Sequence, residues 1–315
     1  MLVTATLRPA WELMNRALFR PSSFNAWISF GVIFFLQSCL ETEGTNFNLN
    51  LPGRGGGGGL SGPGPGGPHM PVIDPSVIAL VVVGVLVVVI PMVVLALWLG
   101  TRGQMMAIRA VASARAELGA TWNGTRDAGY GLFRFQLVLS AISAVLSLPI
   151  VVFFAMTVIQ LLQNEVTFDD VFTTMLILGL MLVVLWIPFA IVKSLVRNFV
   201  APIMLRDGVG AIEAWRKFWS VGRNEVGAII GFLALRIVFE VGAGMLGVAV
   251  GYLTCCIGFL PVIHQALMSP WYVFERAWSL EVLASMGPGF DLIQREPVGW
   301  YGPYAQPYYP PPPPR

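Results

Sequence analysis

Long apolar stretches recur along the chain and are separated by short polar segments. A helix needs about 20 mainly apolar residues to cross the hydrocarbon core of a bilayer. Six stretches meet this requirement: Phe24–Leu40, Val77–Leu99, Phe135–Leu162, Met175–Val196, Val226–Tyr252 and Ile257–Phe274. The last two divide one apolar region, and the Gly and Pro residues at Cys255–Gly258 and Pro261 predict the break between them. The pattern therefore predicts six transmembrane helices.

The basic residues give an independent test of this topology. Cytoplasmic loops of membrane proteins retain Lys and Arg. Seventeen of the nineteen Lys and Arg residues lie before the first stretch, after the last, or in and around the second and fourth connections. The opposite side has Arg54 among several acidic residues. This alternation predicts an even number of spans with both termini in the cytoplasm.

Composition agrees with a lipid environment. Hydrophobic residues make up 56% of the chain and charged residues 11%, against about 25% charged residues in soluble domains. A soluble fold with so little charge would expose large apolar patches and associate. The lipid bilayer is therefore the predicted partner. The basic residues are accounted for by topology, and no basic run with interleaved aromatic residues predicts a nucleic-acid partner.

The polar segments divide the chain into four parts. Residues 1–41 hold an interfacial helix and the first span, and residues 42–74 form a Gly- and Pro-rich external loop. Residues 75–286 hold the other five spans. Residues 287–315 form a Pro- and Tyr-rich cytoplasmic tail, predicted to be disordered with polyproline II character. The tail is interpreted either as a solvated segment or as a docking segment for a protein partner with an aromatic-lined groove.

Three segments that precede spans on the cytoplasmic side combine apolar and basic residues. They are Pro9–Phe19, Gln104–Leu118 and Gly210–Val221, and each is predicted to form an amphipathic helix at the membrane surface. The predicted fold class is therefore all-α, a polytopic membrane helical bundle with cytoplasmic interfacial helices.

Two charged residues lie inside the fifth predicted span. Arg236 and Glu240 are four residues apart, so they share a helix face and can form an ion pair. A charge near the bilayer centre costs about 2.5–3.5 kcal/mol or more, which favours a position inside the bundle. The pair is interpreted as a structural contact or as a polar site for an ion, a proton or an anionic headgroup. His264 of the sixth span is predicted at a similar depth and could complete a proton relay with Glu240.

Glycines of the fifth span form a second pattern. Gly227 and Gly231 make a G-x-x-x-G motif, and Gly247 and Gly251 continue a stripe of small residues. Such residues let helix backbones approach closely in lipid. They are predicted packing positions, with either another helix of the chain or a second copy as the neighbour.

Known catalytic motifs are missing from the sequence. It contains no H-E-x-x-H, no G-x-S-x-G and no Walker-type loop. Two histidines and three cysteines, two of them adjacent, do not predict a metal site, and no cofactor is expected. Leu36-Gln37-Ser38-Cys39 has the form of a lipobox, but the residues before it are long for a signal segment. The chain is predicted not to be an enzyme.

Several short motifs carry a family resemblance. They are Val200-Ala201-Pro202-Ile203-Met204, Ala10-Trp11, Ala214-Trp215, Leu18-Phe19-Arg20-Pro21, Thr254-Cys255-Cys256, Leu260-Pro261, Ser269-Pro270, Phe274-Glu275-Arg276 and the stretch from Ser279-Leu280 through Gly287-Pro288. Together they resemble a family of uncharacterised bacterial multi-pass inner-membrane proteins, over most of residues 8–292. More distantly, the chain is similar to the membrane domain of some glycerophosphodiester phosphodiesterases, without their catalytic domain. The resemblance implies six helices in a bacterial inner membrane and supplies no catalytic residues.

Three functions follow as hypotheses, and the third is an intramembrane enzyme, which a cluster of polar groups around a cavity would support. The first is a non-enzymatic structural or binding component of the cell envelope, because no convergent polar site is visible in the sequence. The alternative is a small-solute or lipid transporter that uses Arg236 and Glu240, with proline-broken helices around a midplane site. The sequence does not decide the oligomeric state.

Overall fold

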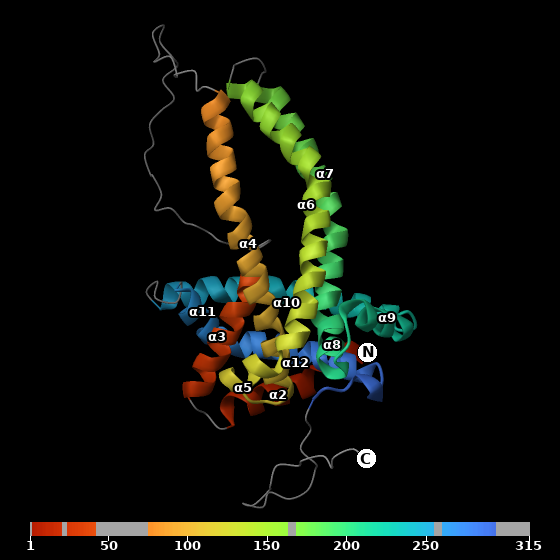
Figure 1. The fold of residues 1–315 in the computed structure, drawn as a ribbon. Coiled ribbons are helices and arrows are strands. Elements are labelled where there is room, and N and C mark those ends of the chain that lie inside the picture. The colour runs from red at the N-terminus through yellow and green to blue at the C-terminus, as the bar shows by residue number, and fades with distance from the viewer. Residues whose placement is uncertain (1, 21–23, 42–74, 163–167, 255–259, 294–315) are drawn as a thin grey trace, which may run out of the picture.

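A computed structural model describes residues 2–20, 24–41, 75–162, 168–254 and 260–293 of the chain. Most of these residues are helical, and none of them forms a β-strand. Three long helices stand upright in Figure 1: α4 (Pro75–Ala112), α6 (Arg126–Leu162) and α7 (Phe168–Leu195). Helices α6 and α7 form a pair, and α4 rises separately from the same base.

The other helices gather around the lower ends of these three, and together with those ends they form what we call the body. They are α1 (Leu2–Ala5), α2 (Leu7–Phe19), α3 (Phe24–Glu41), α5 (Leu118–Gly124), η1 (Val196–Val200), α8 (Ala201–Asp207), α9 (Ala211–Gly222), α10 (Val226–Leu253), α11 (Pro261–Leu267), α12 (Ser269–Ser285) and η3 (Pro288–Phe290). The largest fully buried side chains, such as Trp278, Phe199 and Met105, lie in this body. The upper parts of the upright helices are instead exposed, as at Met92 and Val145, whose exposed fractions are 70% and 69%.

Four described helical stretches are long and apolar enough to cross a membrane. They are Val87–Ala112, Arg126–Thr157, Phe172–Asp207 and Val226–Leu253. The helical segments Val3–Phe19 and Phe24–Leu40 are long and apolar enough only as a pair, and the angle between them is 116°. Length and composition thus indicate a membrane protein.

The predicted sixth span, Ile257–Phe274, differs from the structure. Its first residues, and the break predicted at Cys255–Gly258, fall largely outside the described residues. The rest divides at Met268 into the short α11 and the start of α12. Pro270 lies in the first turn of α12, where its missing N–H leaves no hydrogen bond unmade.

The interfacial helix predicted over Gln104–Leu118 does not exist as a separate element. Helix α4 continues without interruption to Ala112, and between Gln104 and Ala112 only Arg109 is exposed. This segment is apolar on almost every side, and such a helix is buried rather than laid on a surface. The other two predicted segments correspond to α2 and α9, which are separate helices.

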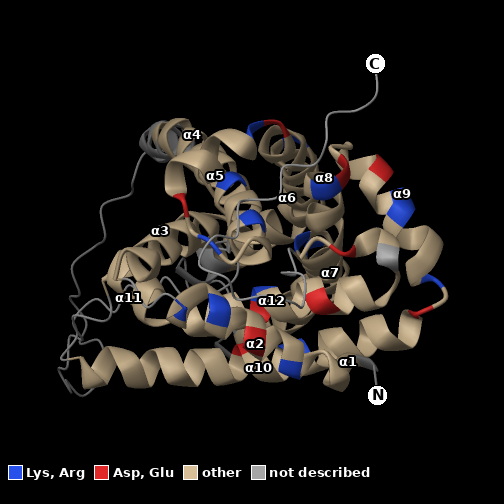
Figure 2. Ribbon diagram, turned by 90° about the horizontal axis from the view of Figure 1, so that it is seen from below, with Lys and Arg blue, Asp and Glu red and all other residues tan. Residues whose placement is uncertain are grey.

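Helix α10 agrees with the fifth predicted span in its bounds but not in its direction. It lies across the base of the upright helices in Figure 1 and runs beside α12 along one side of the body in Figure 2. The six-span prediction has this helix parallel to the others. Ionic contacts of Arg236, described below, hold the middle of α10 on the body.

The closest helix packing occurs between α3 and α4. A Cβ atom added at Gly100 would lie 2.7 Å from the Cα atom of Leu40, and one added at Gly103 would lie 2.7 Å from the Cβ atom of Leu36 and would meet the backbone nitrogen of Gln37. These positions accept only hydrogen, so the backbones of the two helices touch.

The four glycines predicted as packing positions lie on α10 in different surroundings. Within the described chain, no atom lies within 4 Å of a Cβ added at Gly227. Gly231 faces Val3 at 3.8 Å, which is an ordinary contact. Gly247 has a tight neighbour, considered with His264 below, and Gly251 is buried.

Part of the predicted tail is placed against the body. Residues 287–293 include the short helix η3, and the side chain of Ile293 is buried. The Oδ1 atom of Asp291 accepts a hydrogen bond of 3.0 Å from the backbone N–H of Ile293. The apolar residues Phe290, Leu292 and Ile293 give this stretch a reason to pack. The loop at 42–74 and the remainder of the tail lie outside the described residues.

Candidate functional site

Arg236 of α10 is buried and has a partner at each guanidinium nitrogen. Its Nη2 atom lies 2.7 Å from Oε1 of Glu240, one turn further along the helix. Its Nη1 atom donates a hydrogen bond of 2.8 Å to Oγ of Ser194 on α7. Its Nε atom lies 3.2 Å from Oε1 of Glu275 on α12, an ionic contact without hydrogen-bond geometry. The pair predicted from sequence is therefore formed, and it joins α10 to two further helices.

Glu275 is the buried centre of a larger ionic cluster. Besides Arg236, its Oε1 atom lies 3.7 Å from Nη2 of Arg197. Burial alone would raise the pKa of Glu275, but the positive charges of Arg197, Arg236 and Arg276 outweigh it and hold the pKa below its ordinary value. We call Arg197, Arg236, Glu240, Glu275 and Arg276 the Glu275 network.

The position of Arg197 follows from a π-helical turn, Val196–Val200. In this turn the N–H of Ala201 donates to the carbonyl oxygen of Val196, five residues back. In the same pattern, the carbonyl oxygen of Arg197 would accept a hydrogen bond from the N–H of residue 202. Residue 202 is proline and has no N–H. The proline therefore accounts for both the widened turn and a carbonyl oxygen free for other partners. π-Turns of this kind are common at functional sites.

Side chains from two other helices use this carbonyl oxygen. Arg276 donates to it from Nη1 at 2.9 Å, and Gln104 of α4 donates from Nε2 at 3.4 Å. The Nη2 atom of Arg276 donates to Oε1 of Gln37 on α3 at 3.1 Å. The network thus connects α3, α4, α7, the π-turn, α10 and α12.

Aromatic side chains cover the network. Phe232 and Phe239 lie one turn before and after Arg236, and their ring centroids lie 4.6 and 5.4 Å from that of Trp278 on α12. The indole N–H of Trp278 donates to Oγ1 of Thr6 at 3.1 Å, which attaches the N-terminal helix. This cover buries Arg236 and Glu275, and the lower local dielectric strengthens the ionic contact between them.

His264, the third predicted polar residue, lies on α11 and faces a different part of α10. A Cβ atom added at Gly247 would lie 3.1 Å from its Cε1 atom. Gly247 is about 10 Å further along the helix axis than Glu240. The carboxylate of Glu240 points the other way, toward Arg236. The structure therefore does not bring His264 to the pair, and the proton-relay hypothesis has no geometric support.

Sequence reasoning missed Glu275, Arg276 and Arg197 as site residues. Arg197 and Arg276 looked like cytoplasmic topology signals, and Glu275-Arg276 appeared only within a resemblance motif. One feature of the sequence could have identified Glu275. It directly follows an apolar stretch, and a carboxylate at such a position needs a basic partner. The identity of those partners depends on long-range packing.

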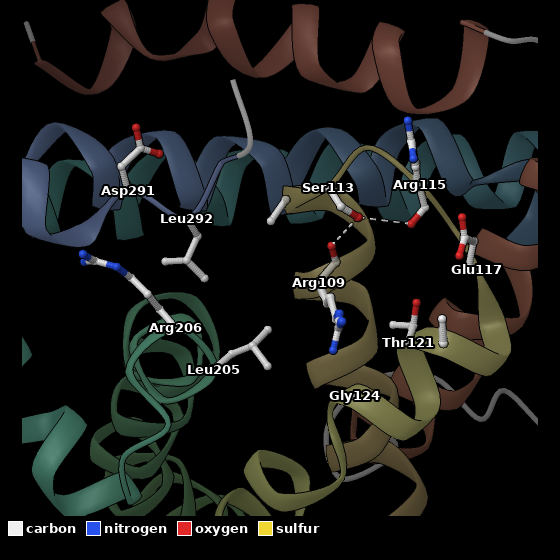
Figure 3. A pocket seen from close by; sticks show the side chains of 12 residues that line it. Arg109, Ser113, Arg115, Glu117, Thr121, Gly124, Leu205, Arg206, Asp291 and Leu292 are labelled. Atoms are coloured by element: carbon white, nitrogen blue, oxygen red, sulfur yellow. Dashed lines mark hydrogen bonds between the residues drawn. The ribbon is translucent and has the colours of Figure 1, made fainter. Parts of the chain in front are cut away.

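Two cavities lie outside the network. The larger, about 550 Å³, is lined by residues of α4, α5, α8, the α4–α5 connection and residues 291–292 (Figure 3). The smaller, about 340 Å³, lies between α3, α4 and α5. Neither is lined by Arg236, Glu240 or Glu275. In the described part of the chain, no group of three or more His, Cys, Asp and Glu residues is placed to hold a metal ion.

Comparisons with known proteins complete the description. A search of curated proteins and a search of solved structures each found no match. The bacterial source and the distant similarity to glycerophosphodiester phosphodiesterases therefore stay predictions. A family model matches residues 1–268, which include Arg197 and Arg236 and end before Glu275. On this match, the chain belongs to DUF7544, a family of unknown function.

Proposed function

We propose that the chain is a non-enzymatic integral membrane protein that acts as a structural or binding component of the cell envelope. The observation that carries this proposal is the surroundings of the buried Arg236, whose guanidinium group contacts Ser194, Glu240 and Glu275 of the chain itself. A catalytic or transport site leaves polar groups free for its substrate. Here the groups hold helices together.

The upright helices supply the membrane attachment in this proposal. No charged residue occurs in residues 75–101, 135–157 or 172–192, and large apolar side chains there are exposed. Lipid is the solvent that such surfaces require. The body then lies at one membrane surface, held rigid by the Glu275 network.

Accessibility of a buried serine tests the proposal. Ser279 lies one turn beyond Glu275 and is fully buried, whereas Ser220 on α9 is exposed. In a chain whose native cysteines are replaced by serine, we expect Ser279→Cys to react with a charged thiosulfonate reagent about 100-fold more slowly than Ser220→Cys. Reaction at position 279 then needs a local opening that costs about 3 kcal/mol. Equal rates at both positions would show a water-filled path and would contradict the closed site.

One observation favours the second candidate, a transporter of small solutes or lipids. The side chain of Glu240 is 54% exposed although it pairs with a buried arginine. A carboxylate in this position could meet a cation or a headgroup from outside the body. The serine labelling separates the two functions, because a transporter needs solvent to reach the network.

The topology predicted from the sequence is the alternative to this arrangement: six spans in a bacterial inner membrane with both termini in the cytoplasm, so that α3 and α10 of the body also cross the bilayer. Its support is the distribution of Lys and Arg along the sequence. This topology requires α10 to cross the membrane. Asn224, just before the helix, and Leu253, at its end, must then lie on opposite sides. The labelling that ends the Discussion includes both positions.

A further inference from the structure

The larger cavity has the size and lining of a small-molecule site. Its volume of about 550 Å³ falls within the ~300–1,000 Å³ typical of ligand pockets. It lies where the C-terminal end of α4 meets α5, α8 and residues 291–292. Figure 3 shows Leu205 and Leu292 pointing into it, so part of its interior is apolar.

Three arginines from separate elements line this cavity: Arg109 of α4, Arg115 of the connection to α5, and Arg206 of α8. Neither Arg109 nor Arg115 forms an ion pair within the described chain. Arg206 has only a 3.9 Å contact with Asp207.

Two acidic residues, Glu117 and Asp291, also line the cavity. The Oδ1 atom of Asp291 already accepts a backbone hydrogen bond. Positive charge is therefore in excess, at three arginines against two carboxylates. The planar guanidinium group is suited to bind phosphate and carboxylate oxygens in pairs.

We propose that this cavity, the arginine pocket, binds a small organic oxyanion: a phosphate ester or carboxylate with an apolar part. Arg109, whose guanidinium group lies against Gly124 in the lining, receives the anionic group, and Leu205 and Leu292 receive the apolar part. The side chains of Arg115 and Arg206 point away from Arg109 in Figure 3 and add positive charge around the cavity. The inference rests on the proposed function, since it names the ligand class of a membrane-attached binding component.

The position of the pocket favours a ligand from water over a lipid headgroup. The uncharged part of α4 ends at Thr101. Arg109 and Ser113 lie about 12 and 18 Å further along the helix axis. The polar headgroup region adds only about 5–8 Å to each side of the hydrocarbon core. A headgroup held at the bilayer surface would not reach the pocket.

Gly124 offers a test that leaves the arginine in place. A Cβ atom added there would fall on Nη1 of Arg109. Because that atom is the end of a flexible side chain, the Gly124→Ala variant is expected to displace the guanidinium group while the fold persists. Arg109→Gln removes the charge directly. Arg216→Gln, on the exposed face of α9, is the matched control.

The experiment is titration calorimetry of the full chain in phosphatidylcholine nanodiscs. Phenyl phosphate is the probe, and phenol is its uncharged counterpart. We expect phenyl phosphate to bind and phenol not to bind. Both Arg109→Gln and Gly124→Ala should weaken binding of phenyl phosphate by about 10-fold or more, the effect of losing one charged hydrogen bond. Arg216→Gln should leave binding unchanged.

Three results would overturn the proposal. The first is no binding of phenyl phosphate to the unaltered chain. The second is binding that Arg109→Gln and Gly124→Ala leave unchanged. The third is loss of binding in nanodiscs that contain phosphatidylglycerol, which would assign the pocket to a headgroup. Absence of phenyl phosphate binding, together with a protected Ser279→Cys, would remove the pocket proposal alone and keep the proposed function.

Discussion

Replacing Glu275 with Gln is expected to lower the free energy of unfolding by about 3–5 kcal/mol, the usual result of removing one partner from a buried ion pair. Three arginines surround this carboxylate, and two of them contact it within 3.7 Å. Without its charge, Arg197 loses its carboxylate and Arg236 keeps only Glu240, which is half exposed. The buried guanidinium charges then have too little compensation.

Denaturant unfolding in a fixed detergent, followed by tryptophan fluorescence, measures this change. Glu213→Gln is the matched control. Glu213 lies on the exposed face of α9 and pairs with Lys217 one turn away, and exposed pairs of this kind contribute little. Equal stability of the two variants would show that Glu275 is not the centre of the network.

The stability of the Glu275→Gln variant should depend on acidic pH differently from that of the unaltered chain. The pKa of Glu275 is held below its ordinary value of 4.5. Its ionised form therefore contributes stability that is fully present above that value and is lost as the pH falls through the lowered pKa. The stability difference between the unaltered chain and Glu275→Gln should stay constant from neutral pH to 4.5 and shrink below it. A difference that shrinks already near neutral pH would indicate a raised pKa instead.

Replacing Gly103 with Ala is expected to destabilise the chain by about 1–3 kcal/mol, the usual effect of an added methyl group in a closed interface. The methyl group would meet the backbone of α3 at Leu36 and Gln37. Backbone atoms cannot rotate away as a side-chain end can, so α3 and α4 must separate. Because Gln37 also accepts a hydrogen bond from Arg276, the shift should disturb the Glu275 network as well.

Gly84→Ala, in the same helix, is the control for Gly103→Ala. No atom of the described chain lies within 4 Å of a Cβ added at Gly84. Alanine is the better helix former by about 1 kcal/mol, so stability should be unchanged or slightly higher. The same denaturant unfolding measures both variants. A Gly103→Ala variant as stable as Gly84→Ala would mean that α3 and α4 do not touch at this point.

Local features of the sequence predicted the local features of the structure. The apolar stretch from Val226 predicted α10 to within one residue at its end. The spacing of Arg236 and Glu240 predicted their contact, because residues four apart on a helix must be neighbours. Both inferences use only the geometry of a single helix.

Features that depend on contacts between helices were not predictable in this way. Glu275 is far from Arg236 in sequence, and only the crosswise placement of α10 brings them together. The glycine pattern predicted close packing on α10. The closest approach between two helix backbones is instead at Gly100 and Gly103 of α4, which meet α3. A small residue permits a close approach, but the neighbouring helix decides whether one occurs. Pro202 likewise acts through the carbonyl that it leaves free for other helices.

The claim on which the account depends is that lipid surrounds the long apolar helices and that the body lies outside it. Labelling of single cysteines by an impermeant maleimide, in right-side-out and inverted membrane vesicles, tests it. Asn123 lies on α5, three residues before α6 begins at the body, and Gln160 lies near the other end of α6; both are exposed. Cysteines at these two positions should react in vesicles of opposite orientation.

Cysteines in place of Asn224 and Leu253 report on α10 in the same measurement. Reaction of these two in opposite orientations supports the six-span topology, and reaction in one orientation removes α10 from the spans. The decisive pair remains Asn123 and Gln160. If both of these react in the same vesicles, α6 does not cross the bilayer, and the membrane account of this chain is contradicted.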